Sequence, residues 1–242
     1  MSTILELDNV HKAFGAVVVA DAQGWSLNEG EALGVIGPNG AGKTSMFNMV
    51  TGTLPLDSGS IRFAGQDITK MSAAQRCRSG IARSFQVPQP FSDMTIFENT
   101  YVAATQAAGL AGHAAESRCL DVLEQTGLAP KANIMAGGLT LLERKRLELA
   151  RAMCANPRVL LLDEIAGGLT ENECQALIAT INDLRATGIS IVWIEHVVHA
   201  LLAVVDRLIV IDFGKKIADG EPHAIMRSQA VKEIYLGIEA DA

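Results

Sequence analysis

A glycine-rich segment in the first quarter of the chain has the residue types of a phosphate-binding loop. The apolar run Leu33–Ile36 leads directly into Gly37-Pro38-Asn39-Gly40-Ala41-Gly42-Lys43-Thr44-Ser45 and a helix-compatible stretch. Glycines let the backbone fold closely around phosphate oxygens, so that N–H groups and the helix N-terminus point at the anion. Lys43 would reach the β- and γ-phosphates, and Thr44 would ligate Mg²⁺. An ordinary glycine-rich turn is the competing interpretation, but the order strand, loop, helix favours the phosphate site.

A pair of acidic residues follows a second apolar run. The run Val159–Leu162 ends in Asp163 and Glu164, as a buried parallel strand does when its carboxyl end brings acids to a nucleotide. Asp163 would hold Mg²⁺ through water, and Glu164 would polarise an attacking water molecule. Alone, the pair would equally fit an acidic strand end that caps the next helix. Together with the loop, it predicts phosphoryl transfer to water.

The hydrophobic pattern indicates the elements that must position these motifs. Residues 1–85 have the pattern of antiparallel strands plus the strand and helix around the loop, and residues 87–150 have mostly helical spacing. Residues 155–242 return to alternating strands and helices, with a hairpin turn at Phe213–Lys215 and a helix that begins at Pro222. This alternation predicts an α/β fold with the nucleotide at the carboxyl ends of parallel strands.

The composition excludes several classes of protein. The 242 residues include 20 Lys and Arg against 27 Asp and Glu, and the formal charge of −7 disfavours binding to nucleic acid. The apolar runs fall short of the roughly 18–20 residues that cross a bilayer. The N-terminus alternates like a first strand and lacks a signal-peptide pattern. The four cysteines are widely spaced, unlike a zinc site or a disulfide framework. We therefore expect a cytoplasmic protein with reduced thiols.

Further motifs, in order from about Leu5 to Gly237, resemble the ATP-binding cassette (ABC) family of transporter ATPases. Gln86, in the segment ARSFQ, stands at the position of the Q-loop glutamine, which implies contact with Mg²⁺ and a relay of the nucleotide state to the membrane subunit. His196, after the apolar run IVWI and Glu195, stands at the position of the switch histidine that contacts the γ-phosphate.

Phe14, in HKAFG, matches the aromatic residue that stacks on adenine in this family. On residue type alone, Phe14 would equally be a core residue of the first strands, Gln86 an exposed loop residue and His196 a hydrogen-bonded strand end. The resemblance implies three catalytic residues, Gln86, Glu164 and His196. It implies three metal ligands, Thr44, Gln86 and Asp163.

The segment that matches the family's signature motif departs from it. Leu139-Thr140-Leu141-Leu142-Glu143 aligns with Leu-Ser-Gly-Gly-Gln, so both glycines are leucines here. Thr140 and Glu143 keep the spacing of a helix capping box, and a helix N-terminus presents N–H groups to an anion. The resemblance implies that Thr140, Leu141 and Leu142 contact the nucleotide of a partner chain. There the leucines would crowd the γ-phosphate and favour weak or asymmetric hydrolysis.

A second departure follows the acidic pair. Residues Gly167-Gly168-Leu169-Thr170 occupy the D-loop position, where the family more often has Ser-Ala-Leu-Asp. Thr170 lacks the carboxylate that an Asp would place in a contact across the dimer interface. Because Thr170 precedes the helical run ENECQALIATINDLRATG, it predicts the N-cap of that helix.

The resemblance also implies an organisation and partners. Residues 1–242 would form one ABC ATPase domain, with a P-loop NTPase core and an antiparallel β part from residues 1–86 and 151–242. Residues 87–150 would form a helical subdomain that carries the signature. The cofactors would be ATP and Mg²⁺. The partners would be a second ABC ATPase subunit, most simply a different paralogue although a homodimer fits too, and permeases contacted through Gln86–Phe91. A periplasmic binding protein would act indirectly, and the chain would lie peripherally on the inner face of the cell membrane.

Details of the sequence look like the subunits of branched-chain and hydrophobic amino acid importers. The matching stretches are LELARAM, IEHVVHALLAVVDRLIVIDFGKKIADGEP and the ending EIYLG. The resulting hypothesis is an ATPase subunit that closes as a dimer around ATP and drives an importer. In this family the binding protein and the permease select the transported solute, so the sequence of this chain does not identify it.

Three other functions compete with this hypothesis. A nucleotide-gated interaction subunit that hydrolyses little is motivated by Leu141 and Leu142. The ATPase is favoured by the intact phosphoryl-transfer residues Lys43, Asp163, Glu164 and His196. A small-molecule kinase would need an arginine-rich lid, but Arg144, Arg146 and Arg151 have helical spacing instead. A cassette of DNA repair is disfavoured by the charge and by the lack of a coiled-coil arm.

Overall fold

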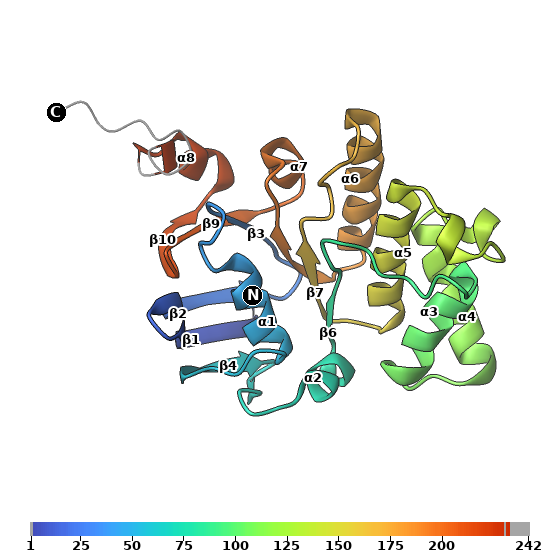
Figure 1. Cartoon of the computed structure of the whole chain (residues 1–242), viewed down its shortest axis with the longest axis horizontal. Coiled ribbons are helices and arrows are strands. Elements are labelled where there is room, and N and C mark those ends of the chain that lie inside the picture. Colours follow the sequence, from blue (N-terminus) through green and yellow to red (C-terminus); the bar gives the residue numbers. More distant parts are fainter. Residues whose placement is uncertain (1, 230, 233–242) are drawn as a thin grey trace.

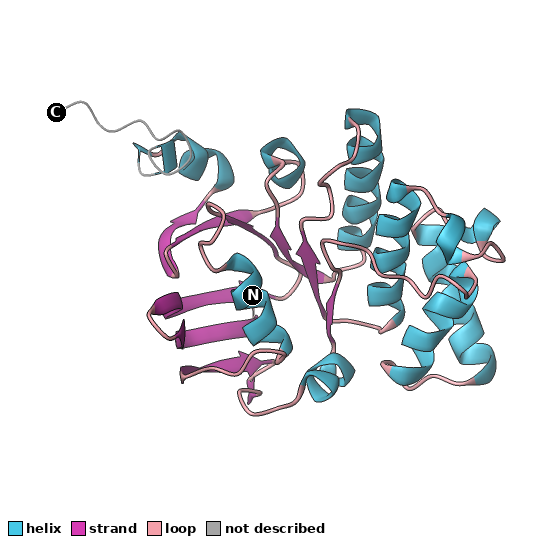
Figure 2. Cartoon of the chain, in the orientation of Figure 1, coloured by secondary structure: helices cyan, strands magenta, loops and turns pink. Residues whose placement is uncertain are grey.

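Strands and helices alternate along the chain as the hydrophobic pattern predicts (Figures 1 and 2). The computed structural model describes residues 2–229, 231 and 232, and the motif EIYLG at 233–237 lies outside them. The described strands are β1 (Thr3–Phe14), β2 (Val17–Asn28), β3 (Ala32–Ile36), β4 (Ser58–Phe63), β5 (Gln66–Asp67), β6 (Ile81–Arg83), β7 (Val159–Asp163), β8 (Ser190–Ile194), β9 (Arg207–Asp212) and β10 (Lys215–Gly220). The described helices are α1 (Lys43–Thr51), α2 (Ala73–Ser79), α3 (Ile96–Gln106), α4 (Gly112–Gln125), α5 (Leu141–Cys154), α6 (Glu171–Ala186), α7 (Val198–Leu202) and α8 (Pro222–Arg227), with 3₁₀ turns at Ala129–Lys131 and Ala136–Gly138.

Within the described residues the strands form two sheets. An antiparallel sheet has the order β2-β1-β4-β5, and a central sheet has the order β10-β9-β3-β8-β7-β6. In the central sheet the neighbours from β9 to β6 pair in parallel, and β10 adds an antiparallel hairpin strand. The carboxyl ends of β3, β6, β7 and β8 therefore meet at one edge. The α/β class with an antiparallel N-terminal part is confirmed.

Two layers of apolar side chains cover the two faces of the central sheet. Along β7, Leu161 points to a core shared with α1 and the antiparallel sheet, whereas Leu160 and Leu162 point to a core shared with α5 and α6. This alternation follows from the period of two residues in a strand. The helix α1 thus lies between the two sheets, as Figure 1 shows, and the loop that precedes it is fixed by the packing of both.

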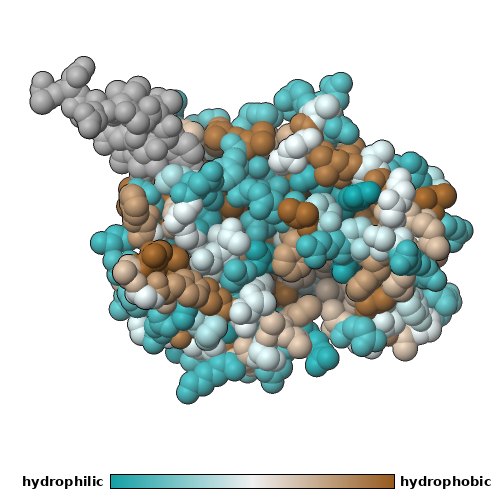
Figure 3. Space-filling model, in the orientation of Figure 1, coloured by the Kyte–Doolittle hydropathy of each residue, from teal (hydrophilic) through white to brown (hydrophobic). Residues whose placement is uncertain are grey.

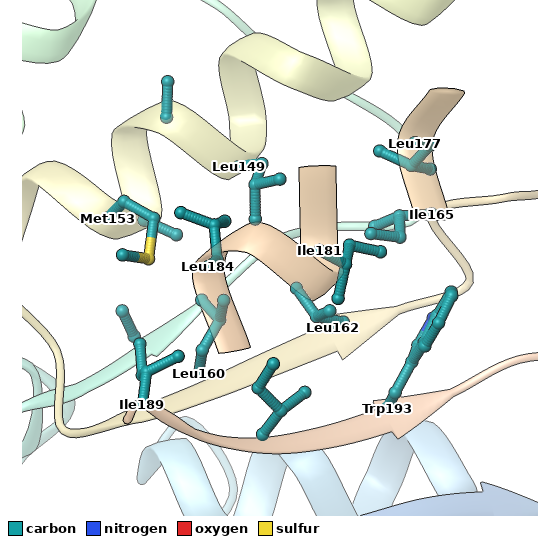
Figure 4. Close-up of a cluster of buried hydrophobic side chains, with 14 of the residues drawn as sticks. Leu149, Met153, Leu160, Leu162, Ile165, Leu177, Ile181, Leu184, Ile189 and Trp193 are labelled. Atoms are coloured by element: carbon teal, nitrogen blue, oxygen red, sulfur yellow. The ribbon is translucent and has the colours of Figure 1, made fainter. Parts of the chain in front are cut away.

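The helical part of the chain packs on the second layer. Helix α5 continues to Cys154, so the division expected at residue 150 falls inside this helix. Figure 4 shows Leu149 and Met153 of α5 in the same apolar cluster as Leu184 of α6 and Leu160 of β7. The end of α5 therefore belongs to the same apolar cluster as β7 and α6.

Local signals set the ends of the elements. Thr170 caps α6 in a capping box with Glu173, as predicted. The turn between β9 and β10 has positive φ at Phe213 and Gly214, and Pro222 is in the first turn of α8, both as predicted. All four cysteines have free thiols. In the described part of the chain, no helix has both the length and the apolar character needed to cross a membrane.

Candidate active site

The loop between β3 and α1 wraps around a space that a phosphate group would fit. Gly42, the residue before α1, has φ of 100°, and a Cβ added there would lie 2.1 Å from the carbonyl oxygen of Val19. At Gly40 the surrounding space is open, and it is the φ of 83° that favours glycine. The loop conformation therefore needs glycine at both positions, for two different reasons.

Lys43 lies at the bottom of this loop. Its ammonium donates to the carbonyl oxygens of Gly37 at 2.7 Å and Pro38 at 2.9 Å, and the residue is 5% exposed. Burial lowers the pKa of Lys43, and the carboxylates of Glu164 and Asp163 oppose that effect.

Residues 39–45 of the predicted phosphate loop border a cavity of about 320 Å³, whereas Gly37 and Pro38 do not line it. It is lined by Val17, Val19, Asn39, Gly40, Ala41, Gly42, Lys43, Thr44, Ser45 and Glu164. A helix N-terminus and a lysine on one concave surface form a site for an anion. These residues fit the phosphate groups of a nucleotide.

Glu164 follows β7 in an unusual backbone conformation. Its φ is 48°, in the left-handed region that costs a non-glycine residue on the order of 1–3 kcal/mol. Its N–H donates to the Ile194 carbonyl at 2.8 Å, and its carbonyl accepts the N–H of Gly167 at 3.4 Å. These bonds fix the backbone of Glu164 at the end of β7. Its side chain lines the phosphate cavity.

The carboxylate of Glu164 contacts Gln86 and His196, the other two residues of the predicted catalytic set. The Gln86 amide donates to Oε2 of Glu164 at 2.5 Å, and Nε2 of His196 lies 2.9 Å from Oε1. The three side chains follow the neighbouring strands β6, β7 and β8. Because Glu164 also lines the phosphate cavity, it is placed to accept a proton from water that attacks a γ-phosphate.

Asp163 has a partner that the sequence reasoning missed. Arg83 of β6 donates to the Asp163 carboxylate at 2.5 Å and to the Asn48 side chain at 2.6 Å. Its guanidinium also lies over the rings of Phe47 and Phe85. Burial raises the pKa of Asp163, and Arg83 opposes that effect. The sequence signal was an arginine at the end of an apolar strand, three residues before Gln86.

The three predicted metal ligands border one cavity of about 510 Å³. Thr44, Gln86 and Asp163 line it together with Arg83. Among the described residues there is no cluster of three His, Cys, Asp or Glu side chains that could hold a metal ion. A hydroxyl, an amide and a carboxylate suit Mg²⁺, which keeps several waters and binds substrate phosphates. The donor set therefore fits a nucleotide-bound Mg²⁺ ion.

Phe14 is not a core residue, so that alternative is wrong. The side chain is 53% exposed at the end of β1, and the ammonium of Lys12 lies 5.4 Å from the ring centre. Phe14 and Ser45 line a groove of about 660 Å³ that runs between α1 and α3, where Figure 3 shows a hollow in the surface. The exposed ring therefore lies on the same groove as Ser45 of the phosphate loop.

The two leucines of the altered signature differ in their surroundings. Leu141 is 43% exposed, whereas Leu142 is partly buried against the core. The capping box between Thr140 and Glu143 is present, as predicted, and Lys131 pairs with the Glu143 carboxylate. Thr140, Leu141 and Leu142 line none of the three cavities described above. The structure thus does not bring the signature residues to this chain's own phosphate site.

The chain belongs to the ABC transporter family, whose model matches residues 21–167. It is an ATPase of that family. It is 34% identical to the high-affinity branched-chain amino acid transport ATP-binding protein BraF of Pseudomonas aeruginosa, over 97% of this chain and 98% of that protein. It is 33% identical to the lipopolysaccharide export system ATP-binding protein LptB of Escherichia coli, over 96% and 97%.

The fold is similar to that of a solved ABC cassette. The structure of the ADP conformation of MJ1267, an ATP-binding cassette of an ABC transporter, matches with a TM-score of 0.89 and 30% identity. The match covers 98% of this chain and 100% of that one. The predicted family and the P-loop NTPase fold are confirmed.

We predict that Lys43→Ala weakens Mg-ATP binding by roughly 100-fold or more, because hydrogen bonds to a charged group contribute about 1.5–3 kcal/mol each. Isothermal titration calorimetry measures the affinity, and circular dichroism checks the fold. The exposed Lys70→Ala is the matched control and should bind normally. Unchanged affinity in Lys43→Ala would remove the phosphate-binding assignment.

Glu164→Gln should keep ATP binding and slow hydrolysis by roughly 10²–10⁴-fold, the range for loss of a general base. The amide has the same shape but cannot take the proton, so the variant should accumulate as an ATP-bound closed dimer. Phosphate release and size-exclusion chromatography with light scattering measure the two effects. Glu124→Gln makes the same charge change on an exposed face of α4. Equal turnover in the two variants would leave water activation to another group.

Arg83→Met should lower the free energy of unfolding by about 3–5 kcal/mol, because it leaves the buried Asp163 carboxylate unpaired. Urea denaturation measures the change. Adding Asp163→Asn to the same chain should recover most of the loss, since the uncompensated charge is then gone. An exposed arginine change, Arg62→Met, is the control. If Arg83→Met has the same free energy of unfolding as the parent, the Arg83–Asp163 ion pair does not stabilise the packing of β6 against β7.

Proposed function

We propose that this chain is the ATP-hydrolysing subunit of an ABC importer for branched-chain amino acids or related small solutes. The observation that carries the ATPase part is the contact of Glu164 with Gln86 and His196 beside the phosphate cavity. The similarity to BraF and the resemblance of residues 194–222 to amino acid importer subunits support the substrate class. LptB, which belongs to an export system, is almost as similar. A transport experiment therefore has to determine the direction of transport and the solute.

In this proposal each residue has a separate task at the nucleotide. The loop amides and Lys43 bind the β- and γ-phosphates, and Phe14 stacks on adenine. Glu164 takes the proton of the attacking water, while Gln86 and His196 orient its carboxylate. Mg²⁺, held at Thr44, Gln86 and Asp163, would neutralise phosphate charge.

The contacts with other subunits involve exposed residues beside the nucleotide site. Phe85, Val87 and Phe91 are exposed around the Q-loop, and Phe85 lines the groove between α1 and α3. Permease subunits dock there, which places the chain on the inner face of the membrane. The start of α5 faces the nucleotide of a second ATPase chain. Because Leu141 protrudes at that position, we propose that this second chain is a different one with glycines in its signature.

A second candidate function rests on Leu141. The exposed Leu141 side chain at the start of α5 obstructs the approach of a partner's γ-phosphate, whereas the Glu143 carboxylate is paired with Lys131. The chain would then be a nucleotide-gated subunit that closes with ATP but hydrolyses little. Turnover of the complete complex separates the two functions, because only the first requires steady phosphate release.

Transport in proteoliposomes tests the importer proposal. The complex that co-purifies with this chain is reconstituted with ATP inside and with a binding protein loaded with radiolabelled leucine outside. ATP-dependent uptake that stops with Glu164→Gln in this chain supports the proposal. Steady ATP hydrolysis without uptake of any branched-chain amino acid would contradict the substrate class but not the ATPase assignment.

We predict that the isolated chain hydrolyses ATP poorly and that Leu141→Gly raises its turnover, because the protruding side chain is removed from the dimer interface. Leu142→Gly is the matched control: its side chain packs against the core, so the change should lower stability without raising turnover. A malachite green assay at several chain concentrations measures turnover. Fast hydrolysis by the unaltered chain, or no gain with Leu141→Gly despite dimer closure, would contradict the crowding argument.

A further inference from the structure

Beneath the active-site loop lies a buried lysine, Lys145 of α5. The residue is 3% exposed, and its ammonium is 3.5 Å from the carbonyl oxygen of Glu164. Burial lowers the pKa of Lys145, and the carboxylates of Glu195 and Glu164 oppose that effect. A buried ammonium is costly unless such partners surround it. Lys145 therefore has an electrostatic connection to the residue that activates water.

The nearby carboxylate of Glu195 joins two active-site loops. Glu195 is 1% exposed, and its Oε2 accepts the N–H of Ala166 at 2.9 Å. Its Oε1 accepts the N–H groups of His196 at 2.9 Å and Val197 at 3.3 Å. The backbone of the loop after β7 and the backbone of the loop after β8 thus both donate hydrogen bonds to the buried Glu195 carboxylate. The Lys145 ammonium, which lies 3.5 Å from the Glu164 carbonyl oxygen, also interacts electrostatically with this carboxylate.

The position of Lys145 on α5 extends this network to the signature. Leu141 and Lys145 are one helical turn apart and share a face of the helix. A Cβ added at Gly168 would lie 3.3 Å from a methyl group of Leu141, so this face of α5 runs along the loop at 164–168. Farther along, Leu149 and Met153 anchor α5 in the core (Figure 4).

We propose that Lys145 is a positioning residue for Glu164. Together with Glu195, it holds the loop at 164–168 so that the Glu164 backbone keeps its left-handed conformation and the carboxylate faces Gln86 and His196. Because the signature forms the start of α5, a displacement of this helix would be transmitted to the Glu164 backbone through the Lys145 contact. That last step rests on the proposed dimer, in which the signature of one chain contacts the nucleotide of the other. The catalytic glutamate of each chain then senses the nucleotide in the partner's site.

Single-turnover hydrolysis of ATP by the full chain tests the positioning role. Lys145→Met should lower the hydrolysis rate roughly 10- to 100-fold, the scale expected for a misplaced catalytic group. The affinity for Mg-ATP should stay within about threefold, because Lys145 does not line the phosphate cavity. Lys145→Gln is the second variant, for use if the Lys145→Met protein does not fold. Leu149→Val, which trims core packing on the same helix, is the matched control for general destabilisation and should keep the rate per folded molecule.

A double-mutant cycle separates positioning from a structural role. If Lys145 acts through Glu164, Lys145→Met should cause no further loss in a chain that already carries Glu164→Gln. A loss of the same size in both backgrounds would overturn the proposal. So would a parent-like rate in both Lys145 variants, or a large loss of ATP affinity.

Hydrogen exchange tests the same proposal without any hydrolysis. Amides in the peptide that covers residues 164–168 should exchange faster in Lys145→Met than in the parent or in Leu149→Val. Unchanged exchange there would overturn the proposal. If no complex containing this chain hydrolyses ATP, the proposed function fails, whereas the exchange result still decides whether Lys145 holds the loop.

Discussion

The contact between the Glu164 carboxylate and the side chains of Gln86 and His196 is the interaction on which the rest of the site depends. The contact exists because three neighbouring parallel strands, β6, β7 and β8, end at one edge of the central sheet. Each strand delivers one residue, and the left-handed backbone at Glu164 turns its side chain toward the phosphate cavity. The strained conformation persists because bonds from the next strand and loop fix it.

Buried charge shapes the surroundings of this contact. Lys43, Arg83 and Lys145 are all largely buried, and each lies beside carbonyl oxygens or carboxylates that offset the cost of burial. Arg83 connects Asp163 with the groove beside the Q-loop. Lys145 connects Glu164 with the helix that begins at the signature. The two acidic residues thus contact different buried cations, Asp163 the Arg83 guanidinium and Glu164 the Lys145 ammonium.

Sequence patterns predicted the parts of this site that are local in the chain. The glycine loop, the acidic pair after an apolar strand and the caps at Thr140 and Thr170 depend on residues within a few positions of one another. The partner of Asp163 was not predictable in this way, because it depends on β6 lying beside β7. The different surroundings of Leu141 and Leu142 likewise depend on how α5 docks on the core, which helical spacing alone does not give.

A crystal structure of the chain carrying Glu164→Gln with Mg-ATP tests the central claim most directly. The account predicts the γ-phosphate within about 3 Å of the Lys43 ammonium and the His196 ring, with the new amide at position 164 facing the water on its open side. Mg²⁺ should contact Thr44 and lie near Asp163. A nucleotide bound elsewhere, or a γ-phosphate that points away from His196 and position 164, would contradict the account.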